Sequence, residues 1–210
     1  MGGQDGIVNV LGVVLGVAAS GTDTRIVLVA GLAAAFAESV SMAAVAYTSK
    51  LADKDFYEKE CEREETEIKN HPELERDEIR AIYIQKGFSG DLLDSIVNTI
   101  TSDEKVWLKN MMLEELGLEP VSTKNIVRDT IVVGLSAILG SLVPLIPFLL
   151  IPQNHPMIIS VILCGGVLFV VGAYQAKTYV GNWLQKGIQM VLIGLGAALV
   201  GYIIGKLFQV

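Results

Sequence analysis

Residues Ile26 to Leu51 read "IVLVAGLAAAFAESVSMAAVAYTSKL", an apolar run whose only carboxylate is that of Glu38. A helix needs about 20 mostly apolar residues to cross roughly 30 Å of hydrocarbon, so this run is long enough to span a membrane. Four further stretches qualify or nearly qualify, approximately at 4–20, 126–151, 156–174 and 184–208. We therefore predict an all-α membrane protein with five transmembrane helices.

The charges are concentrated in one part of the chain. Hydrophobic residues make up 51% of the sequence and charged residues only 19%, which is unlike an ordinary soluble domain. Twelve of the sixteen Lys and Arg residues and nineteen of the twenty-three Asp and Glu residues lie between Lys50 and Arg128. The net charge of −7 therefore belongs to this insert. A polyanionic insert argues against nucleic acid as a partner and favours cations.

The insert is predicted to be helical. The helix that begins in the second apolar run continues through the acidic block and stops at His71, because a residue before proline is pushed out of the α region. Three pieces follow, "PELERDEIRAIYIQKG", "SGDLLDSIVNTI" and "SDEKVWLKNMMLEELG". We predict transmembrane helices 1 and 2 in residues 1–51, a cytosolic three-helix metal-binding insert in 52–125, and transmembrane helices 3 to 5 in 126–210.

The acidic helices carry carboxylates at helical spacing. Three glutamates line one face before Pro72, and two share a face just after it: Glu60, Glu64, Glu67, Glu75 and Glu78. Only Arg63 is near enough to offset the first three, and like charges at this spacing oppose the helix. A helical hairpin at Pro72 would bring the two sets together. The alternative is a solvated face with i,i+4 ion pairs, such as Glu65 with Lys69.

A carboxylate cluster of this kind predicts a divalent metal. Carboxylate oxygens suit Mg²⁺, Ca²⁺, Mn²⁺ and Fe²⁺. The last insert helix adds Met111 and Glu115 on a shared face, although paired methionines usually fill a core. A thioether ligand would favour a softer ion such as Fe²⁺. The Glu-x-x-His pair of ferritin-like oxidases is missing, and we predict no enzymatic activity and no cofactor beyond the bound or transported metal.

Two carboxylates lie in apolar surroundings, Asp5 and Glu38. An ionisable group inside a membrane helix costs a few kcal/mol on insertion scales, so it is a functional candidate by default. Asp5 shares a helix face with Asn9, and Glu38 shares one with Met42. The sequence thus indicates a transport path, whereas Cys61 and Cys164 receive no role.

Small residues and prolines have a structural interpretation. Two G-x-x-x-G pairs, Gly12 with Gly16 and Gly201 with Gly205, favour close helix approach, within the chain or across a dimer. Two prolines in "LVPLIPFLL" predict a kink in the third membrane helix.

The ordered set "DGIVNVLGVVLGVAASG", "SVSMAAVAY", "REETEIKNHPELERDEI", "MMLEELGLEP" and "LSAILGSLVPLIPFLL" resembles the vacuolar iron transporter family over essentially the whole chain. The resemblance implies five membrane helices, a cytosolic metal-binding domain, a homodimer, and proton-coupled export of Fe²⁺, often also Mn²⁺, from the cytosol. It implies that Asp5 and Met42 belong to the path. It also implies a ligand set in the insert: Glu64, Glu67, Glu75, Glu78, Met111 and Glu115.

Two positions depart from the family pattern. The path glutamate of the plant members would fall at Ala34, one turn before Glu38, which leaves two alternatives: either Glu38 substitutes for it from the next turn, or the proton-coupling scheme differs. The family pattern also has a ligand carboxylate at the position next to Met111, where this sequence has Met112 instead. We include Met112 in the predicted ligand set.

Short loops predict the orientation. Residues 151–156 carry no Lys or Arg, whereas Lys177 and Lys186 bracket the next connection, which places that connection, the insert and the N-terminus on the cytoplasmic side. No Lys or Arg precedes the first apolar run, so it is expected to be a retained membrane helix rather than a signal peptide. We expect a multi-pass protein of the cell membrane if the source is prokaryotic, which is favoured, and of the vacuolar membrane if it is eukaryotic.

Three hypotheses follow for function. The first is a dimeric exporter of Fe²⁺ or Mn²⁺ whose partners are divalent metal ions and the lipid bilayer. The second is a membrane-anchored metal buffer or sensor, for which the membrane carboxylates would be dispensable. The third, a soluble all-helical protein, is excluded if the chain needs detergent for extraction.

Overall fold

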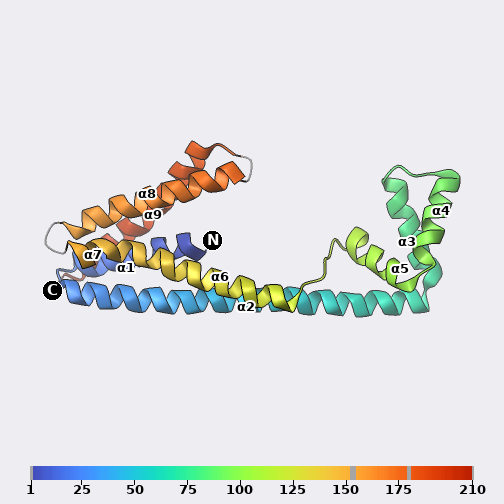
Figure 1. Ribbon diagram of the computed structural model, residues 1–210, viewed down its shortest axis with the longest axis horizontal. Helices are drawn as coiled ribbons and strands as arrows, with labels where there is room; N and C mark the ends of the chain where they lie inside the picture. The colour runs from blue at the N-terminus through green and yellow to red at the C-terminus, as the bar shows by residue number, and fades with distance from the viewer. Residues whose placement is uncertain (1, 152–154, 179–180, 210) are drawn as a thin grey trace. The chain divides into compact units, whose positions relative to one another are not determined.

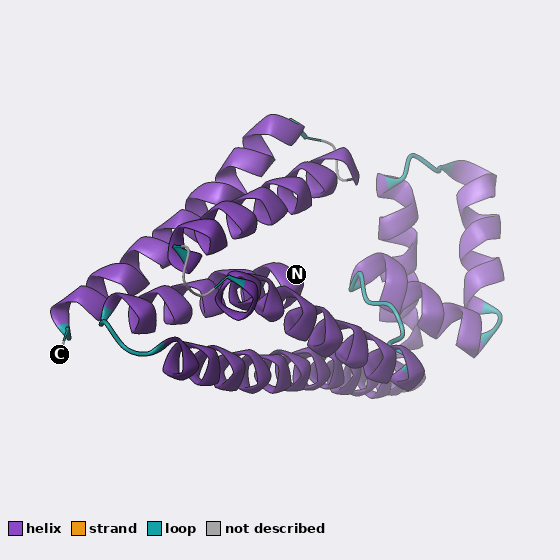
Figure 2. Cartoon of the chain, turned by 60° about the vertical axis from the view of Figure 1, so that its left-hand side comes forward, coloured by secondary structure: helices purple, strands orange, loops and turns teal. Residues whose placement is uncertain are grey.

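The computed structural model describes residues 2–151, 155–178 and 181–209, and these residues form helices and loops without a strand (Figure 2). The helices follow one another along the chain in Figure 1. Their bounds are α1 Gly2–Ala19, α2 Thr24–Asn70, α3 Pro72–Gln85, α4 Gly90–Thr101, α5 Glu104–Asn110, a π-helical turn Met111–Glu115, α6 Thr123–Leu142, a 3₁₀ turn Val143–Leu145, α7 Ile146–Leu150, α8 Pro156–Thr178 and α9 Trp183–Leu207.

The chain divides into two compact units. The apolar unit comprises residues 1–47 and 127–210, and the acidic unit comprises residues 48–126. Helix α2 begins in the apolar unit and ends in the acidic unit at Asn70, directly before the Pro72 break that the sequence predicted. Each unit has its own hydrophobic core.

In the apolar unit α1 is the central helix, because two of its faces are buried in different clusters. One face packs Ile7, Leu11 and Leu15 against Cys164 and Leu168 of α8. The other face packs against α2, the 3₁₀ turn and α7, through Val10, Val14, Val27, Ala35, Leu145 and Phe148. Figure 1 shows α1 between α2 on one side and α8 and α9 on the other. The two-sided burial explains why this helix is apolar around most of its circumference.

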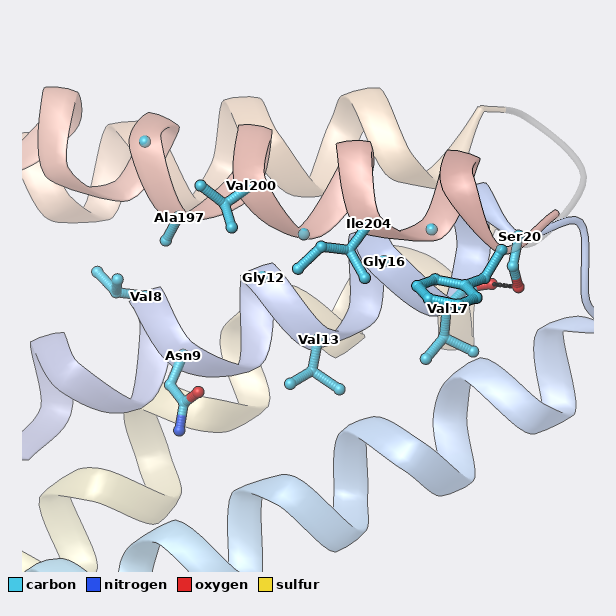
Figure 3. Close-up of a pocket in the computed structure, with 14 residues that line it drawn as sticks. Val8, Asn9, Gly12, Val13, Gly16, Val17, Ser20, Ala197, Val200 and Ile204 are labelled. Atoms are coloured by element: carbon cyan, nitrogen blue, oxygen red, sulfur yellow. Dashed lines mark hydrogen bonds between the residues drawn. The ribbon is translucent and has the colours of Figure 1, made fainter.

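Helix α9 lies against α1 at the predicted glycine pairs. A methyl group built at Gly201 would overlap the carbonyl oxygen of Gly12, and one built at Gly205 would overlap that of Gly16. The two G-x-x-x-G pairs therefore face each other within one chain. An open, largely apolar groove of about 670 Å³ runs beside this contact, lined by residues of α1 and α9 (Figure 3).

The prolines of the third long apolar segment interrupt its helix as expected. Helix α6 ends at Leu142, the 3₁₀ turn holds Pro144, and α7 continues with Pro147 in its first turn. The hydroxyl of Ser160 on α8 donates a 2.8 Å hydrogen bond to the Pro144 carbonyl. This bond supplies a partner for a carbonyl group at the helix interruption, where regular helical bonding is lost.

Five helical segments of the described residues are long and apolar enough to cross a membrane: 2–19, 24–70, 123–150, 156–178 and 183–207. Many of their outward side chains are large and apolar, including Val40, Leu139, Ile162, Leu192 and Leu199. An exposed apolar surface of this extent fits contact with lipid and not with water. The chain is a multi-pass membrane protein. The predicted turns at 151–156 and 176–183 lie partly outside the described residues.

The acidic unit combines the last part of α2 with α3, α4 and α5. Its core is a cluster of Ile68, Ile79, Leu93, Val97, Ile100, Trp107 and Met111. Arg80 on α3 forms an ion pair with Asp94 on α4 at 2.6 Å. Arg76, also on α3, donates a hydrogen bond to Asn98 on α4. The side chain of Asp103 caps α5 by accepting bonds from the backbone N–H groups of Lys105 and Val106. These contacts fix three short helices that could not form alone in water.

Candidate metal centre

The turn at Pro72 brings the acidic faces of α2 and α3 together, as the sequence predicted. One carboxylate oxygen from each of Glu64, Glu67 and Glu75 lies within 4.8 Å of the others. Ile68 and Ile79, one turn from Glu64 and Glu75, are buried in the core of the acidic unit, and they hold the two glutamate-bearing faces inward. Packing of apolar neighbours thus positions the carboxylates.

Two of these carboxylates are buried to an unusual degree. Glu64 is 1% exposed and Glu75 is 5% exposed. The Oε2 atom of each has no hydrogen-bond partner within the described residues. A buried carboxylate oxygen without a partner is costly, since most buried polar atoms are paired or coordinate a metal. The pair of inward oxygens is therefore the strongest indication of a cation site in this unit.

The electrostatics of the cluster favour protonation or a bound cation. Burial raises the pKa of Glu75 to about 7, and repulsion from the carboxylates of Glu78, Glu67 and Glu115 adds to the shift. Burial also raises the pKa of Glu64, where the adjacent Arg63 works in the opposite direction. A divalent ion would compensate these charges at neutral pH better than a proton could.

Glu115 joins the cluster from a π-helical turn. Partial desolvation and the charges of Glu78 and Glu64 raise its pKa to about 7, and its carboxyl hydrogen-bonds to that of Glu78. The turn is closed by a 3.3 Å bond from the Leu116 N–H to the Met111 carbonyl, five residues back. A π turn changes which side chains share a face, and such turns are frequent at functional sites.

The two methionines lie in the same π-helical turn and are fully buried. Met111 packs in the hydrophobic core with Ile68 and Trp107, which is the common role of a buried methionine. Glu114, by contrast, is exposed and pairs with Lys86 at 2.5 Å. The structure therefore gathers five glutamates, whereas the part of Met111 and Met112 as ligands stays a prediction.

In the apolar unit, the carboxylates of Asp5 on α1 and Glu38 on α2, both predicted path residues, lie near each other. The Asn9 amide donates a hydrogen bond to Oε2 of Glu38, and Asp5 is close enough to interact electrostatically with the same carboxylate. Figure 3 shows Asn9 pointing away from α9. Asp5 and Asn9 are exposed, while Glu38 and Met42 are half-buried. The arrangement is a polar strip on an otherwise apolar surface.

Ala34, the position that the family pattern would give to a path glutamate, packs against the apolar cluster around Val10 and Val14. The carboxylate in the apolar part of α2 lies one turn later, at Glu38, which accepts a hydrogen bond from Asn9. Sequence reasoning placed Asn9 beside Asp5 but did not pair it with Glu38. The sequence did carry a signal for this pairing, because an amide and a carboxylate in neighbouring membrane helices have few other polar partners.

Comparison with known proteins places the chain in a family. A family model described as the VIT family matches residues 1–206. Vacuolar iron transporter 1 of Tulipa gesneriana is 30% identical over 210 residues, covering 100% of this chain and 85% of the relative. Vacuolar iron transporter 1 of Arabidopsis thaliana is 28% identical, covering 100% and 84%, and the vacuolar iron transporter of Toxoplasma gondii is 32% identical, covering 99% and 72%. The match extends through both the apolar and the acidic unit, and this chain belongs to the VIT family.

Proposed function

We propose that this chain is a divalent-metal transporter that exports Fe²⁺, and also Mn²⁺, from the cytosol in exchange for protons. The observation that carries the proposal is the pair of buried, unpartnered carboxylate oxygens of Glu64 and Glu75, held beside Glu67. The names of the relatives, which are vacuolar iron transporters, support a metal as the transported species.

The acidic unit collects the ion. Its ligands are the five glutamates of the cluster together with the two methionines of the π-helical turn: Glu64, Glu67, Glu75, Glu78, Glu115, Met111 and Met112. The carboxylates suit any hard divalent cation, and a thioether among the ligands discriminates in favour of Fe²⁺ over Mg²⁺ or Ca²⁺.

The path through the membrane uses Asp5, Glu38 and Met42. An ionised carboxylate binds the cation and a protonated one releases it, so each carboxylate exchanges a metal ion for a proton. The Asn9 amide holds Glu38 toward α1 by donating to its carboxylate. Helix α2 carries both path residues and cluster residues, because Glu38, Met42, Glu64 and Glu67 all belong to it.

The working form is a homodimer with the N-terminus and the acidic unit on the cytoplasmic side. Asp5 and Asn9 are exposed on the surface of a single chain, although a carboxylate facing lipid costs a few kcal/mol. A second copy that covers this strip would turn one polar wall into an enclosed path. Twelve of the sixteen basic residues lie in the insert and its flanks, in agreement with the positive-inside rule.

Uptake of Mn²⁺ or Fe²⁺ into proteoliposomes tests the path. We expect uptake by the wild type and loss of uptake after combined replacement Asp5→Ala and Glu38→Ala. Asp23→Asn is the matched control, because Asp23 is exposed in the turn between α1 and α2 and should be dispensable. Transport that survives the double replacement would remove the proposed path.

The second candidate is a membrane-anchored metal buffer or sensor. It is favoured by the fact that the whole glutamate cluster lies within the acidic unit, which has its own core. Combined replacement Glu64→Gln and Glu75→Gln should lower transport at low metal concentration if the cluster feeds the path. The control carries Glu62→Gln and Glu73→Gln, two exposed carboxylates on the same helices. Metal binding without uptake by the wild type would favour the buffer or sensor.

A further inference from the structure

One guanidinium group joins three glutamates at the edge of the cluster. Nε of Arg63 lies 2.9 Å from Glu60, Nη2 lies 2.7 Å from Glu64, and Nη1 lies 2.7 Å from Glu67. Each nitrogen thus engages a different carboxylate, and two of the three belong to the proposed ligand set. The fork geometry of arginine permits this and the single nitrogen of lysine does not.

Several other basic side chains of this unit pair with carboxylates outside the proposed ligand set. Lys69 pairs with Glu65 and Glu104, Lys86 pairs with Glu114, and Arg80 pairs with Asp94. Across residues 2–151, 155–178 and 181–209, the ion pairs that reach the proposed ligands all come from Arg63. Among the described residues, Arg63 therefore supplies the ion-paired positive charge next to the cluster.

The contacts divide the Glu64 carboxylate into two sides. Its Oε1 forms an ion pair with Nη2 of Arg63 at 2.7 Å, whereas its Oε2 is buried without a hydrogen-bond partner, as is Oε2 of Glu75. The inward oxygens are open to an ion, but an ion that also takes Glu67 must compete with the guanidinium for that carboxylate. Arginine stays charged at every pH at which the protein is folded, so this competition cannot be relieved by deprotonation.

We propose that Arg63 is a built-in counter-cation that lowers the affinity of the glutamate cluster for divalent metal. The inference rests on the proposed function, in that the cluster must bind metal. Without Arg63, five carboxylates would hold a divalent ion with no opposing positive charge nearby. With it, the ion replaces guanidinium bonds to Glu64 and Glu67 on binding, and the guanidinium returns to them on release. A site that passes its ion onward requires such a limit on affinity.

Binding of Mn²⁺ to the full chain in detergent, measured by electron paramagnetic resonance of the free ion, tests the proposal. The background carries Asp5→Asn and Glu38→Gln, which removes the path carboxylates. At about pH 8 we expect Arg63→Gln to lower the Kd by about tenfold, because one opposing charge beside the ion is lost, although solvent screens it. Arg63→Lys, which keeps the charge, should stay within about threefold of the Kd of the background protein.

Arg80→Gln is the matched control, since Arg80 pairs with Asp94 outside the cluster, and its Kd should be unchanged. A purely structural role for Arg63 predicts the opposite sign, weaker binding by Arg63→Gln. An unchanged or higher Kd for that variant would overturn the proposal, and Arg63→Met supplies a second neutral variant if Arg63→Gln does not fold.

The Mn²⁺ binding results distinguish a failure of the Arg63 proposal from a failure of the proposed function. If Mn²⁺ binding by the background protein is absent, or is insensitive to Glu64→Gln with Glu75→Gln, the cluster is no metal site and both fail. If binding requires those glutamates but Arg63→Gln does not tighten it, only the role of Arg63 fails.

Discussion

Replacement of Glu75 by glutamine should stabilise the metal-free protein at alkaline pH. The pKa of Glu75 is about 7 in the folded chain, against 4.5 for an ordinary glutamate. A raised folded-state pKa means that stability is fully present below pH 4.5 and is lost as the pH rises toward 7 and above. For this one group the loss in the free energy of unfolding is on the order of 3 kcal/mol at pH 8. Glutamine keeps the shape without the charge, so Glu75→Gln should recover most of that loss.

Tryptophan fluorescence isolates the relevant unit. The chain has two tryptophans, and Trp107 lies in the core of the acidic unit while Trp183 begins α9. Urea unfolding in mild detergent with a chelator, in a Trp183→Phe background, therefore reports on the acidic unit alone. Glu73→Gln, an exposed change on the same helix, is the control and should have little effect at either pH.

The effect of Glu75→Gln on stability should depend on pH. Glu75→Gln should be more stable than the background protein at pH 8 by about 2–3 kcal/mol and nearly equal to it at pH 4.5. A variant that is no more stable at pH 8, or a parent whose stability rises between pH 5 and pH 8, would show that the Glu75 carboxylate is not electrostatically strained in this cluster.

Three further outcomes follow from the structure. Saturating Mn²⁺ at about 100 times its Kd should raise the free energy of unfolding of the acidic unit by about 2.7 kcal/mol, and a chelator should reverse the gain; no gain would speak against a metal site there. Gly201→Ala should lower the thermal midpoint in detergent, with a cost of about 1–3 kcal/mol, because the added methyl overlaps the Gly12 carbonyl oxygen, whereas Gly196→Ala on the same helix meets no atom within 4 Å and should be neutral. Asp103→Ala removes the cap of α5 and should cost about 1 kcal/mol in urea unfolding, and an unchanged midpoint would contradict the capping role.

The helices could be predicted from the sequence because the residues that determine them are close together in the chain. Apolar runs of membrane length, the stop before Pro72 and the break at Pro144 each depend on a few adjacent residues, and the structure confirms them. The exact start of α5 does not follow from the sequence, because the quoted segment offers both Ser102 and Asp103 at its beginning and it is Asp103 that accepts the backbone bonds. A one-residue difference of this kind depends on backbone angles that a pattern does not carry.

The candidate metal site could be predicted only in part from the sequence. The faces of Glu64 with Glu67 and of Glu75 with Glu78 follow from helical spacing, and a hairpin at Pro72 was enough to join them. The π-helical turn that carries Glu115 is different, because one extra residue in a turn has no sequence signature and depends on the packing around it.

Contacts between residues far apart in the chain were the hardest to predict from the sequence. The bond between Asn9 and Glu38 joins α1 to α2, and its formation depends on how the two helices are rotated. Burial of Glu64 likewise follows from the whole acidic unit, so the sequence could give its neighbours but not its exposure.

Metal uptake driven by a pH gradient tests proton-coupled export by this chain. Proteoliposomes with an acidic lumen are given external Mn²⁺, and metal uptake is followed together with the rise in lumenal pH, for the wild type, Glu38→Gln and the Asp23→Asn control. Proton-coupled export predicts that uptake and proton efflux depend on the gradient, that both are lost in Glu38→Gln, and that both persist in the control. Uptake by the wild type that is indifferent to the gradient, or undiminished in Glu38→Gln, would contradict it.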